Sequence, residues 1–573
     1  MMFDAYDLLR EQWLPVRYED GHVASIAPHE ITTAHDEHGL PVDLAWSRPD
    51  FNGAMIQFLI GLVQTIYAPT NRRAWRKRLS APPTSDVLAD AFAPVASAFV
   101  LHTSPEGGGF MQDPGDLGLK QKDIKPAAWL LIDAPTDNTI KTNKDHFTHS
   151  LDARTLSMGE AAAALYTLQT FAPGGGPGQR TSLRGGGPLT TLPLGRTLWE
   201  TVWLSVLPED EFDALGSTSE YSEAEGDSTF PWLAPPDEPI TSDRDEPMTR
   251  ESGHPLQMYW AMPRRIQLRV QPCPDTEEAR VTGFLTRPRG ANYDGSWEHP
   301  LSPYGTTSEG VLIAQKGSSE RLQYNHWVGL VTNRAATRPA LVVRALPGRL
   351  PRERLRQHVR GGDAPLLWAF GYDMDNAKAR LWIESRQIPI VLADLAADDD
   401  VREALEVFVE QVALAADVLA GALRKHLREA LLAKLALERG RLRGIQVPKK
   451  LSSASGVILD QAARRFWLDT EARFLQAIKE ARRLCEEPPD DLEATLRTVR
   501  IDWLADVKPV LLGIYDDVAA RASDPASRTV ARQRLSLAAT PTAQASRDVC
   551  KALGLPLPRK PSRKKKTPSP SPS

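Results

Sequence analysis

The last third of the chain limits the available folds most strongly, because it consists of long segments with apolar residues at helical spacing. The first segment spans residues 399–443, and three more follow at 458–484, 491–522 and 526–553. Apolar residues three or four positions apart occupy one face of an α-helix, and each such face must be buried. Since short connections containing proline or glycine join the segments, we expect a four-helix bundle at residues 399–555.

The residues before the bundle have a mixed pattern. Residues 12–28 alternate between apolar and polar around Glu19-Asp20-Gly21, which predicts a β-hairpin. Helices are predicted at 54–68, 86–101 and 157–171, and strands at 264–270 and 339–346. We therefore predict an α+β fold, with a large mixed N-terminal domain at residues 1–395 followed by the helical bundle.

Charge is unevenly distributed along the chain. There are 73 acidic residues against 69 lysines and arginines, giving a net charge of −4, so any contact with nucleic acid must be local. Residues 208–258 are acidic and rich in proline and serine, which predicts a long surface loop, with Trp232 as a candidate anchor. The tail at 556–573 is basic and of low complexity, and we expect it to be disordered.

Several protein classes are disfavoured by composition. No run of 18 apolar residues exists, so we expect no membrane span. The N-terminal residues carry acids and lack an apolar stretch, so we expect no secretory signal. Three isolated cysteines, Cys273, Cys485 and Cys550, form neither a metal-binding pair nor a disulfide framework. A cytoplasmic protein is predicted.

Catalytic signatures are absent from the sequence. There is no GxxxxGK[ST], HExxH or GxSxG motif. The pairs His35/His38 and His146/His149 lie in polar segments without companion carboxylates, which is typical of solvated loops. We expect a binding subunit with no catalytic residue, metal or cofactor. Two alternatives remain: a metal-dependent nuclease or phosphohydrolase around Asp145, His146 and His149, and a scaffold that binds no DNA.

The most distinctive segment is FAPGGGPGQRTSLRGGGPLTTL, residues 171–192. Glycines without a Cβ allow another molecule to approach the backbone, and neighbouring arginines supply forked donors for phosphate. The spacing fits no mononucleotide-binding motif, and a flexible linker is the alternative. The residues of interest are Gly174, Gly175, Gly176, Gly178, Arg180, Arg184 and Gly185–Gly187.

This segment resembles the glycine-rich core of the CasA family, the large subunit of the type I-E CRISPR surveillance complex called Cascade. Further similar segments follow one another in the family's order from about residue 12 to about residue 480. They are QWLPVR (Gln12–Arg17), GFMQ (Gly109–Gln112), LRGGGPLTTL (183–192) with LWETVWLSVL (198–207), RVTGFL (280–285), Trp297 with HPLSPY (299–304), and GYDMDNAKAR (Gly371–Arg380).

The resemblance implies a non-catalytic subunit of antiviral defence that recognises the protospacer-adjacent motif (PAM) in double-stranded target DNA. Family members read this motif through the minor groove, help to open the duplex for R-loop formation with the guide RNA, and recruit a separate CRISPR helicase-nuclease. Carried over by position, the implied DNA-binding residues are Gly174, Gly175, Gly176, Gly178 and Arg180, with the wedge hairpin at Asp375, Asn376 and Ala377. Some members have glutamine at the position of Asn376.

Four further expectations depend on the resemblance. A minor-groove lysine of some members aligns with Pro288, and either Arg287 or Arg289 can replace it. The loop at 131–147 is similar to the loop that contacts the guide RNA and other Cascade subunits, through Asn138, Lys141, Asn143 and Lys144. Some relatives carry a four-cysteine zinc site, but only Cys273 lies in that region here, so no zinc is expected. Basic bundle residues that can guide the displaced strand are Arg424, Lys425, Arg428, Lys449 and Lys450.

Overall fold

The computed structural model divides the chain into two compact units. The first comprises residues 1–322 and 329–396, and the second comprises residues 323–328 and 397–573. The structure describes residues 5–101, 109–134, 155–175, 178–213, 215, 226–235, 247–273, 278–318, 324–332, 337–361, 365–375, 378–389, 399–440, 453–522 and 525–558.

The first unit opens with a small antiparallel sheet in the order β2-β1-β3. Its strands are β1 (Leu14–Tyr18), β2 (Val23–Ile26) and β3 (Pro41–Leu44). The turn between β1 and β2 contains Gly21 at a φ of +91°, a conformation that favours glycine. The hairpin predicted around residues 19–21 is therefore confirmed.

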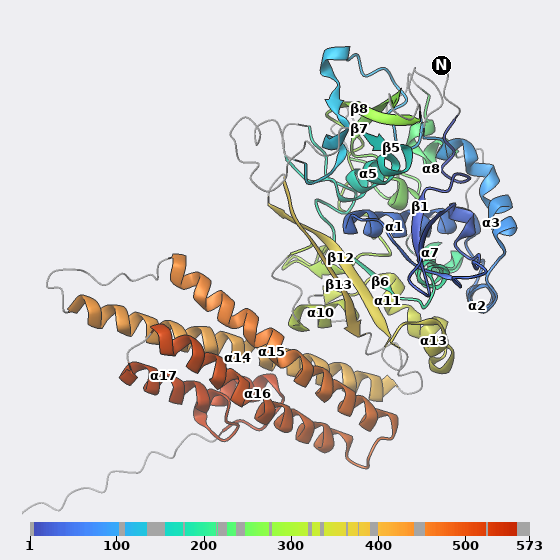
Figure 1. Cartoon of the computed structure of the whole chain (residues 1–573). Helices are drawn as coiled ribbons and strands as arrows, with labels where there is room; N and C mark the ends of the chain where they lie inside the picture. Colours follow the sequence, from blue (N-terminus) through green and yellow to red (C-terminus); the bar gives the residue numbers. More distant parts are fainter. Residues whose placement is uncertain are drawn as a thin grey trace, which may run out of the picture. The chain divides into compact units, whose positions relative to one another are not determined.

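Helix α1 (Pro49–Tyr67) forms the centre of this unit and is buried along most of its length. It packs beside α5 (Met158–Phe171), which begins with a capping box formed by Ser157 and Glu160. Both helices are drawn in Figure 1. Phe58 of α1 lies edge-on to a group of aromatic rings, with centroids 5.7–5.9 Å away, from Trp13, Phe99, Phe110, Tyr166 and Trp260. This aromatic core fixes the helix from which the glycine-rich segment emerges.

Three further sheets surround these helices. Strands β12 (Leu366–Asp375) and β13 (Lys378–Pro389) form a long antiparallel hairpin, which Figure 1 shows in yellow, and β6 (Thr190–Pro193) pairs with β12. Strands β7 (Arg265–Pro272) and β8 (Ala279–Arg287) pair, and β4 (Lys125–Pro126) and β5 (Leu156–Ser157) extend that sheet. The last sheet contains β9 (Tyr304–Thr306), β10 (Leu312–Ala314) and β11 (Thr337–Arg338).

Short helices complete the first unit, and two of them correct the sequence analysis. Residues 339–346 were expected to form a strand but form α11 (Leu341–Arg344) and the start of α12 (Leu346–Arg349), because Val342, Val343 and Leu346 are buried at helical spacing. The remaining helices are α2 (Arg72–Ser80), α3 (Ser85–Phe92), α6 (Leu198–Leu204), α7 (Glu209–Asp213), α8 (Gly226–Thr229), α9 (Gln257–Trp260) and α13 (Arg352–His358), while α10 (Tyr324–Val331) begins within the second unit.

The acidic segment at 208–258 is less of a loop than its composition indicated. Its described parts include α7, α8 and the first half of α9, and its residues Phe230 and Trp232 contact each other and Trp260 in the core. Trp232 is buried and its indole N–H donates to the Ala98 carbonyl at 2.7 Å, so the predicted anchor is confirmed. Aromatic burial overrides the polar composition at this point.

The second unit is a helical bundle. Its long helices are α14 (Asp399–Gly440), α15 (Ser453–Glu486) and α16 (Leu492–Ala522). The fourth predicted helix is wrong in extent: α17 (Pro525–Ala538) ends before Pro541, and a separate short helix, α18 (Arg547–Ala552), follows. Proline lacks the N–H that an interior helical position needs. The predicted α+β class with a C-terminal bundle is confirmed, and no helix in the described residues has the length and apolar character needed to cross a membrane.

Candidate nucleic-acid interface

The glycine loop, defined here as residues 174–178, follows directly from the end of α5 at Phe171. Gly175 is exposed, and Gly174 and Gly178 are half-buried at the surface. Gly175 has a φ of +120° and Gly178 a φ of +75°, backbone conformations that other residues adopt only with strain. At Gly174, Gly175 and Gly178 the backbone therefore lies at the surface, while Gly176 and Pro177 lie outside the described residues.

The glycine loop contacts the turn that follows β8, defined here as the arginine turn (Arg287–Arg289). The Arg289 N–H donates to the Gly178 carbonyl at 2.7 Å. A Cβ at position 178 would lie 3.0 Å from the Cβ of Pro288 and 3.1 Å from the Cγ of Arg289. Two of the segments singled out by the sequence, more than a hundred residues apart, therefore form one continuous surface.

The structure distinguishes the two arginines of this turn. Arg287 donates from Nε to the Leu117 carbonyl at 2.8 Å and from Nη2 to the Gly118 carbonyl at 3.2 Å, so its guanidinium ties down a neighbouring loop. Arg289 is exposed and has a φ of +64°, which is uncommon for a residue with a side chain. Arg289 is thus the arginine whose backbone touches the glycine loop.

The second glycine run, Gly185–Gly187, has a different environment from the first. A Cβ at Gly187 would lie 2.5 Å from the Met374 Cγ and 2.7 Å from the Tyr372 carbonyl oxygen, so the backbone is pressed against β12. A Cβ at Gly186 would lie 3.2 Å from the backbone nitrogen of Gly174. Gly186 and Gly187 are buried and pack between the glycine loop and the hairpin strand. The sequence analysis grouped both runs in one segment at 171–192 and did not predict this difference in environment.

The wedge hairpin is described up to its tip. Asp375 pairs in register with Lys378, its side chain is exposed, and Arg380 approaches it at 3.9 Å. Asn376 and Ala377 lie outside the described residues. Met374, which contacts Gly187, immediately precedes Asp375 and so connects the second glycine run to the base of the tip.

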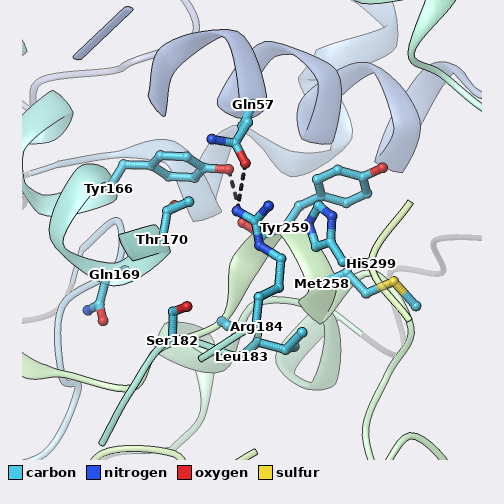
Figure 2. A pocket seen from close by; sticks show the side chains of 11 residues that line it. Gln57, Tyr166, Gln169, Thr170, Ser182, Leu183, Arg184, Met258, Tyr259 and His299 are labelled. Atoms are coloured by element: carbon cyan, nitrogen blue, oxygen red, sulfur yellow. Dashed lines mark hydrogen bonds between the residues drawn. The ribbon is translucent and has the colours of Figure 1, made fainter. Parts of the chain in front are cut away.

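Arg184 does not lie on the surface where the sequence analysis placed it. Its side chain is buried and bonds to neutral groups: Nη2 donates to Gln57 at 2.7 Å, and Nη1 donates to Thr190 at 2.9 Å and Ser302 at 3.0 Å. Figure 2 shows the guanidinium below Gln57 of α1, beside Tyr166 and His299. Burial lowers the pKa of Arg184 to about 10. This arginine holds the second glycine run in place and is unavailable to phosphate.

Arg264, at the start of the β7 region, was missed by the sequence analysis. It is 9% exposed, and its two terminal nitrogens donate to the Pro173 carbonyl and to the side chain of Gln179. These two residues flank the glycine loop on either side. Burial lowers the pKa of Arg264 to about 10. No signal in the sequence marks this residue, because Pro-Arg-Arg before a strand is unremarkable in itself.

The remaining candidates are dispersed. Arg180 is half-buried, with its Nε hidden from solvent. Arg424 pairs with Asp460 at 3.0 Å on the exposed surface of the bundle. Lys425 and Arg428 lie in α14. Several candidates fall outside the described residues: Asn138, Lys141, Asn143, Lys144, Asp145, His146, His149, Lys449 and Lys450.

Histidines gather at one place on the surface of the first unit. The rings of His22 and His38 stack at 3.8 Å, with His35 4.5 Å from His38, and Asp20 accepts a bond from His38 at 2.7 Å. Stacked rings do not converge on a common point, and no group of three or more histidine, cysteine or acidic side chains in the described part of the chain is arranged to hold a metal ion.

Comparison with known proteins gives a consistent result. The family model for the CRISPR-associated protein Cse1 matches residues 7–504. The structure is similar to Cse1 from Acidimicrobium ferrooxidans, with 18% identity, a TM-score of 0.64, and coverage of 97% of this chain and 99% of that one. It is also similar to Thermobifida fusca Cse1, with 17% identity, a TM-score of 0.63, and coverage of 96% and 98%. A chain of a CRISPR RNA-guided surveillance complex matches with 18% identity, a TM-score of 0.62, and coverage of 93% and 99%. At these identities the likeness establishes the fold.

Proposed function

The chain belongs to the Cse1 family of CRISPR-associated proteins, and from this premise we propose that it is the non-catalytic large subunit of a type I-E Cascade that reads the PAM in duplex DNA. The partners of this proposal are the other Cascade subunits, the guide RNA and the target DNA. One similar chain belongs to an RNA-guided surveillance complex, which supports the assignment.

The observation that carries the proposal is the continuous surface made by the glycine loop and the arginine turn. Gly178 abuts Pro288 and Arg289, and Gly175, three residues earlier in the chain, is exposed. Backbone without side chains can enter a narrow minor groove, where peptide N–H groups meet the N3 and O2 acceptors of the base edges. The Arg289 guanidinium adds attraction for the phosphates on either side of the groove.

Strand opening is assigned to the β12–β13 hairpin. Its strand ends at Asp375 and resumes at Lys378, and the second glycine run packs against Met374 just below this tip. A wedge braced on the same segment that contacts the motif can act on the base pair next to it. Unstacking one step costs on the order of a few kcal/mol, which contacts to the motif and pairing with the guide RNA can offset.

Two parts of the proposal concern other partners. The loop at 131–147 is assigned to the guide RNA and neighbouring subunits, and the chain as a whole is assigned a landing surface for the helicase-nuclease. Within the described part of the loop at 131–147, Asp133 accepts a hydrogen bond from Arg48 at 2.9 Å. Arg48 also donates to Asp50 at the start of α1. The loop therefore starts from a fixed point of the core.

The proposal is tested by titrating reconstituted Cascade with duplexes in which the three base pairs beside the guide-matched sequence are randomised. We expect Gly178→Val to remove the preference among these duplexes, since a branched side chain would collide with Pro288 and fill the surface. The affected quantity is the ratio of affinities between the best and the average duplex, expected to fall at least tenfold.

The matched control is Gly21→Val. Gly21 also has a positive φ, of +91°, but a Cβ there would meet nothing within 4 Å, and it lies in the β1–β2 turn. It carries the same backbone strain without altering the proposed surface. An unchanged affinity ratio in Gly178→Val, with the complex assembled, would show that the glycine loop does not read the motif.

A further inference from the structure

We infer that Arg264 is the positioning residue of the glycine loop: its guanidinium binds both flanks of the loop and holds the glycine backbone in its DNA-reading conformation. One terminal nitrogen bonds to the Pro173 carbonyl, before the glycines, and the other bonds to the Gln179 side chain, after them. The inference rests on the proposed function for its consequence, but the clamp itself is a feature of the fold.

The backbone of Arg264 is itself firmly anchored. Gln169 of α5 accepts a bond from the Arg264 N–H at 2.9 Å and donates to the Arg264 carbonyl at 2.9 Å. Gln169 is buried and lies four residues before Pro173. The guanidinium thus reaches the loop from a point that is fixed to the same helix from which the loop emerges.

Arg264 also lies against the arginine turn. A Cβ at Gly290 would lie 2.3 Å from the Pro263 carbonyl oxygen and 2.9 Å from the Arg264 nitrogen, so this glycine allows the turn to pack directly on the chain at Arg264. Ala291 donates to the Met262 carbonyl at 3.0 Å in the same contact. Arg264 therefore contacts both the glycine loop and the chain on which the arginine turn packs, and so connects the two parts of the proposed DNA surface.

The need for such a clamp follows from the composition of the loop. Glycine has more backbone freedom to lose on ordering than any other residue, so an unanchored glycine loop pays a large entropic cost when it binds. A clamp that fixes the loop beforehand transfers this cost from binding to folding. Among the described residues no ion pair joins Arg264 to a carboxylate, so the two loop contacts are the hydrogen bonds of its terminal nitrogens, while its Nε is buried without a hydrogen-bond partner.

Two arginine variants separate geometry from charge. Arg264→Gln removes the fork and the charge, whereas Arg264→Lys keeps the charge but offers a single ammonium group that cannot reproduce the planar fork. A positioning role predicts that both variants lower motif-dependent affinity about tenfold in the titration above. Full affinity in Arg264→Lys would overturn the clamp in favour of a simple effect of charge.

A double-mutant cycle with Gln179 tests the contact directly. Gln179 is exposed, so Gln179→Ala leaves the core intact and keeps the inference testable even if Arg264→Gln folds poorly. Because the two side chains act through one contact, the effect of the double variant on affinity should be smaller than the product of the single effects. Independent, multiplying effects would contradict a clamp.

Hydrogen exchange of the backbone amides at 174–180 provides a readout that does not depend on DNA. In the assembled complex, Arg264→Gln should raise exchange in this loop at least tenfold while leaving α5 protected. The control is Arg78→Gln, because the Arg78 guanidinium also donates to two backbone carbonyls, of Tyr67 at 2.8 Å and Ala68 at 3.2 Å, in another part of the unit. Unchanged loop exchange in Arg264→Gln would overturn the inference.

The two proposals fail in distinguishable ways. If Gly178→Val abolishes motif preference but Arg264→Gln changes neither affinity nor exchange, the clamp is wrong and the reading loop stands. If Arg264→Gln releases the loop in the exchange experiment while Gly178→Val leaves motif preference intact, the clamp stands and the glycine loop is not the reader.

Discussion

The two glycine runs of residues 171–192 have nearly the same composition and opposite environments. In the first, Gly174, Gly175 and Gly178 present backbone at the surface and Gly178 contacts Arg289, whereas in the second Gly187 is pressed against β12. Their arginines differ in the same way: Arg264 holds the flanks of the first run, and Arg184 holds the second run from within the core. In the first run the absence of a side chain leaves the backbone accessible to another molecule, and in the second it allows the backbone to pack closely against a strand.

This difference implies that substitutions in the first run should mainly affect DNA binding, whereas substitutions in the second run should mainly affect the stability of the fold. In the first run, an added side chain at Gly175 would enter exposed surface where the proposed ligand binds, and one at Gly178 would meet the side chains of Pro288 and Arg289. In the second run, an added side chain meets the backbone of a central strand, which cannot move without disturbing the sheet. The predictions below use this contrast, beginning with the largest effect.

Gly187→Ala should give the largest loss of stability. The new Cβ would lie 2.5 Å from Met374 Cγ and 2.7 Å from the Tyr372 carbonyl oxygen, and position 187 has a φ of +61°. Overpacking and backbone strain together predict a loss of about 3 kcal/mol or more in the free energy of unfolding. Denaturant unfolding of the isolated subunit measures it.

Gly310→Ala is the control for strain alone, since Gly310 has a φ of +82° and open space around its Cβ position. We expect a loss of only about 1 kcal/mol there. Equal losses for the two variants would mean that contact with β12 does not constrain the second run.

The buried environment around Arg184 should also make stability depend on pH. Burial and the nearby Arg184 charge hold the pKa of His299 well below its usual 6.5. Leu301 donates to the Nδ1 of His299 at 3.1 Å, so the ring is held in a neutral form. The folded state therefore binds this proton less readily than the unfolded state, and stability is full above about pH 6.5 and is lost as the pH falls below it.

The size of this effect follows from one proton. Below pH 6.5, the free energy of unfolding should fall by about 1.4 kcal/mol per pH unit on account of His299. His299→Gln should remove this part of the slope, whatever its effect on stability at neutral pH. If the pH profiles of the two proteins are parallel, His299 takes up its proton as readily in the folded state as in the unfolded state. That result would contradict a lowered pKa for this buried ring.

The success of sequence analysis differed between regions for physical reasons. The helices α14, α15 and α16 were predicted closely, because long amphipathic segments carry a repeated local signal. The strand predicted at 339–346 was wrong, because short apolar runs have no periodicity that distinguishes a strand from a buried helix. The break after α17 was not predicted, because the apolar spacing on both sides of Pro541 suggested one continuous helix from 526 to 553.

The candidate site shows the same limit. Composition was sufficient to single out the glycines, but it could not tell which run is exposed, since that depends on where β12 lies. The contact between Gly178 and Arg289 joins distant segments and has no local signature. Arg264 was missed for the same reason, because its role is defined by two partners that the fold brings together.

The smallest effect is expected for the two arginines of the arginine turn, which the sequence left as equal alternatives. Arg289→Gln should weaken binding of all duplexes by about 1 kcal/mol or less and reduce the slope of log affinity against log salt by about 1, since one phosphate contact is lost. Arg287→Gln should leave the salt slope unchanged, because its guanidinium is bonded to the Leu117 and Gly118 carbonyls. Titrations of reconstituted Cascade at several salt concentrations measure both slopes. The opposite result, with only Arg287→Gln changing the slope, would mean that Arg287 exchanges its internal bonds for phosphate on binding, and the exposed surface would then have to extend toward residues 117–118 instead of ending at the glycine loop.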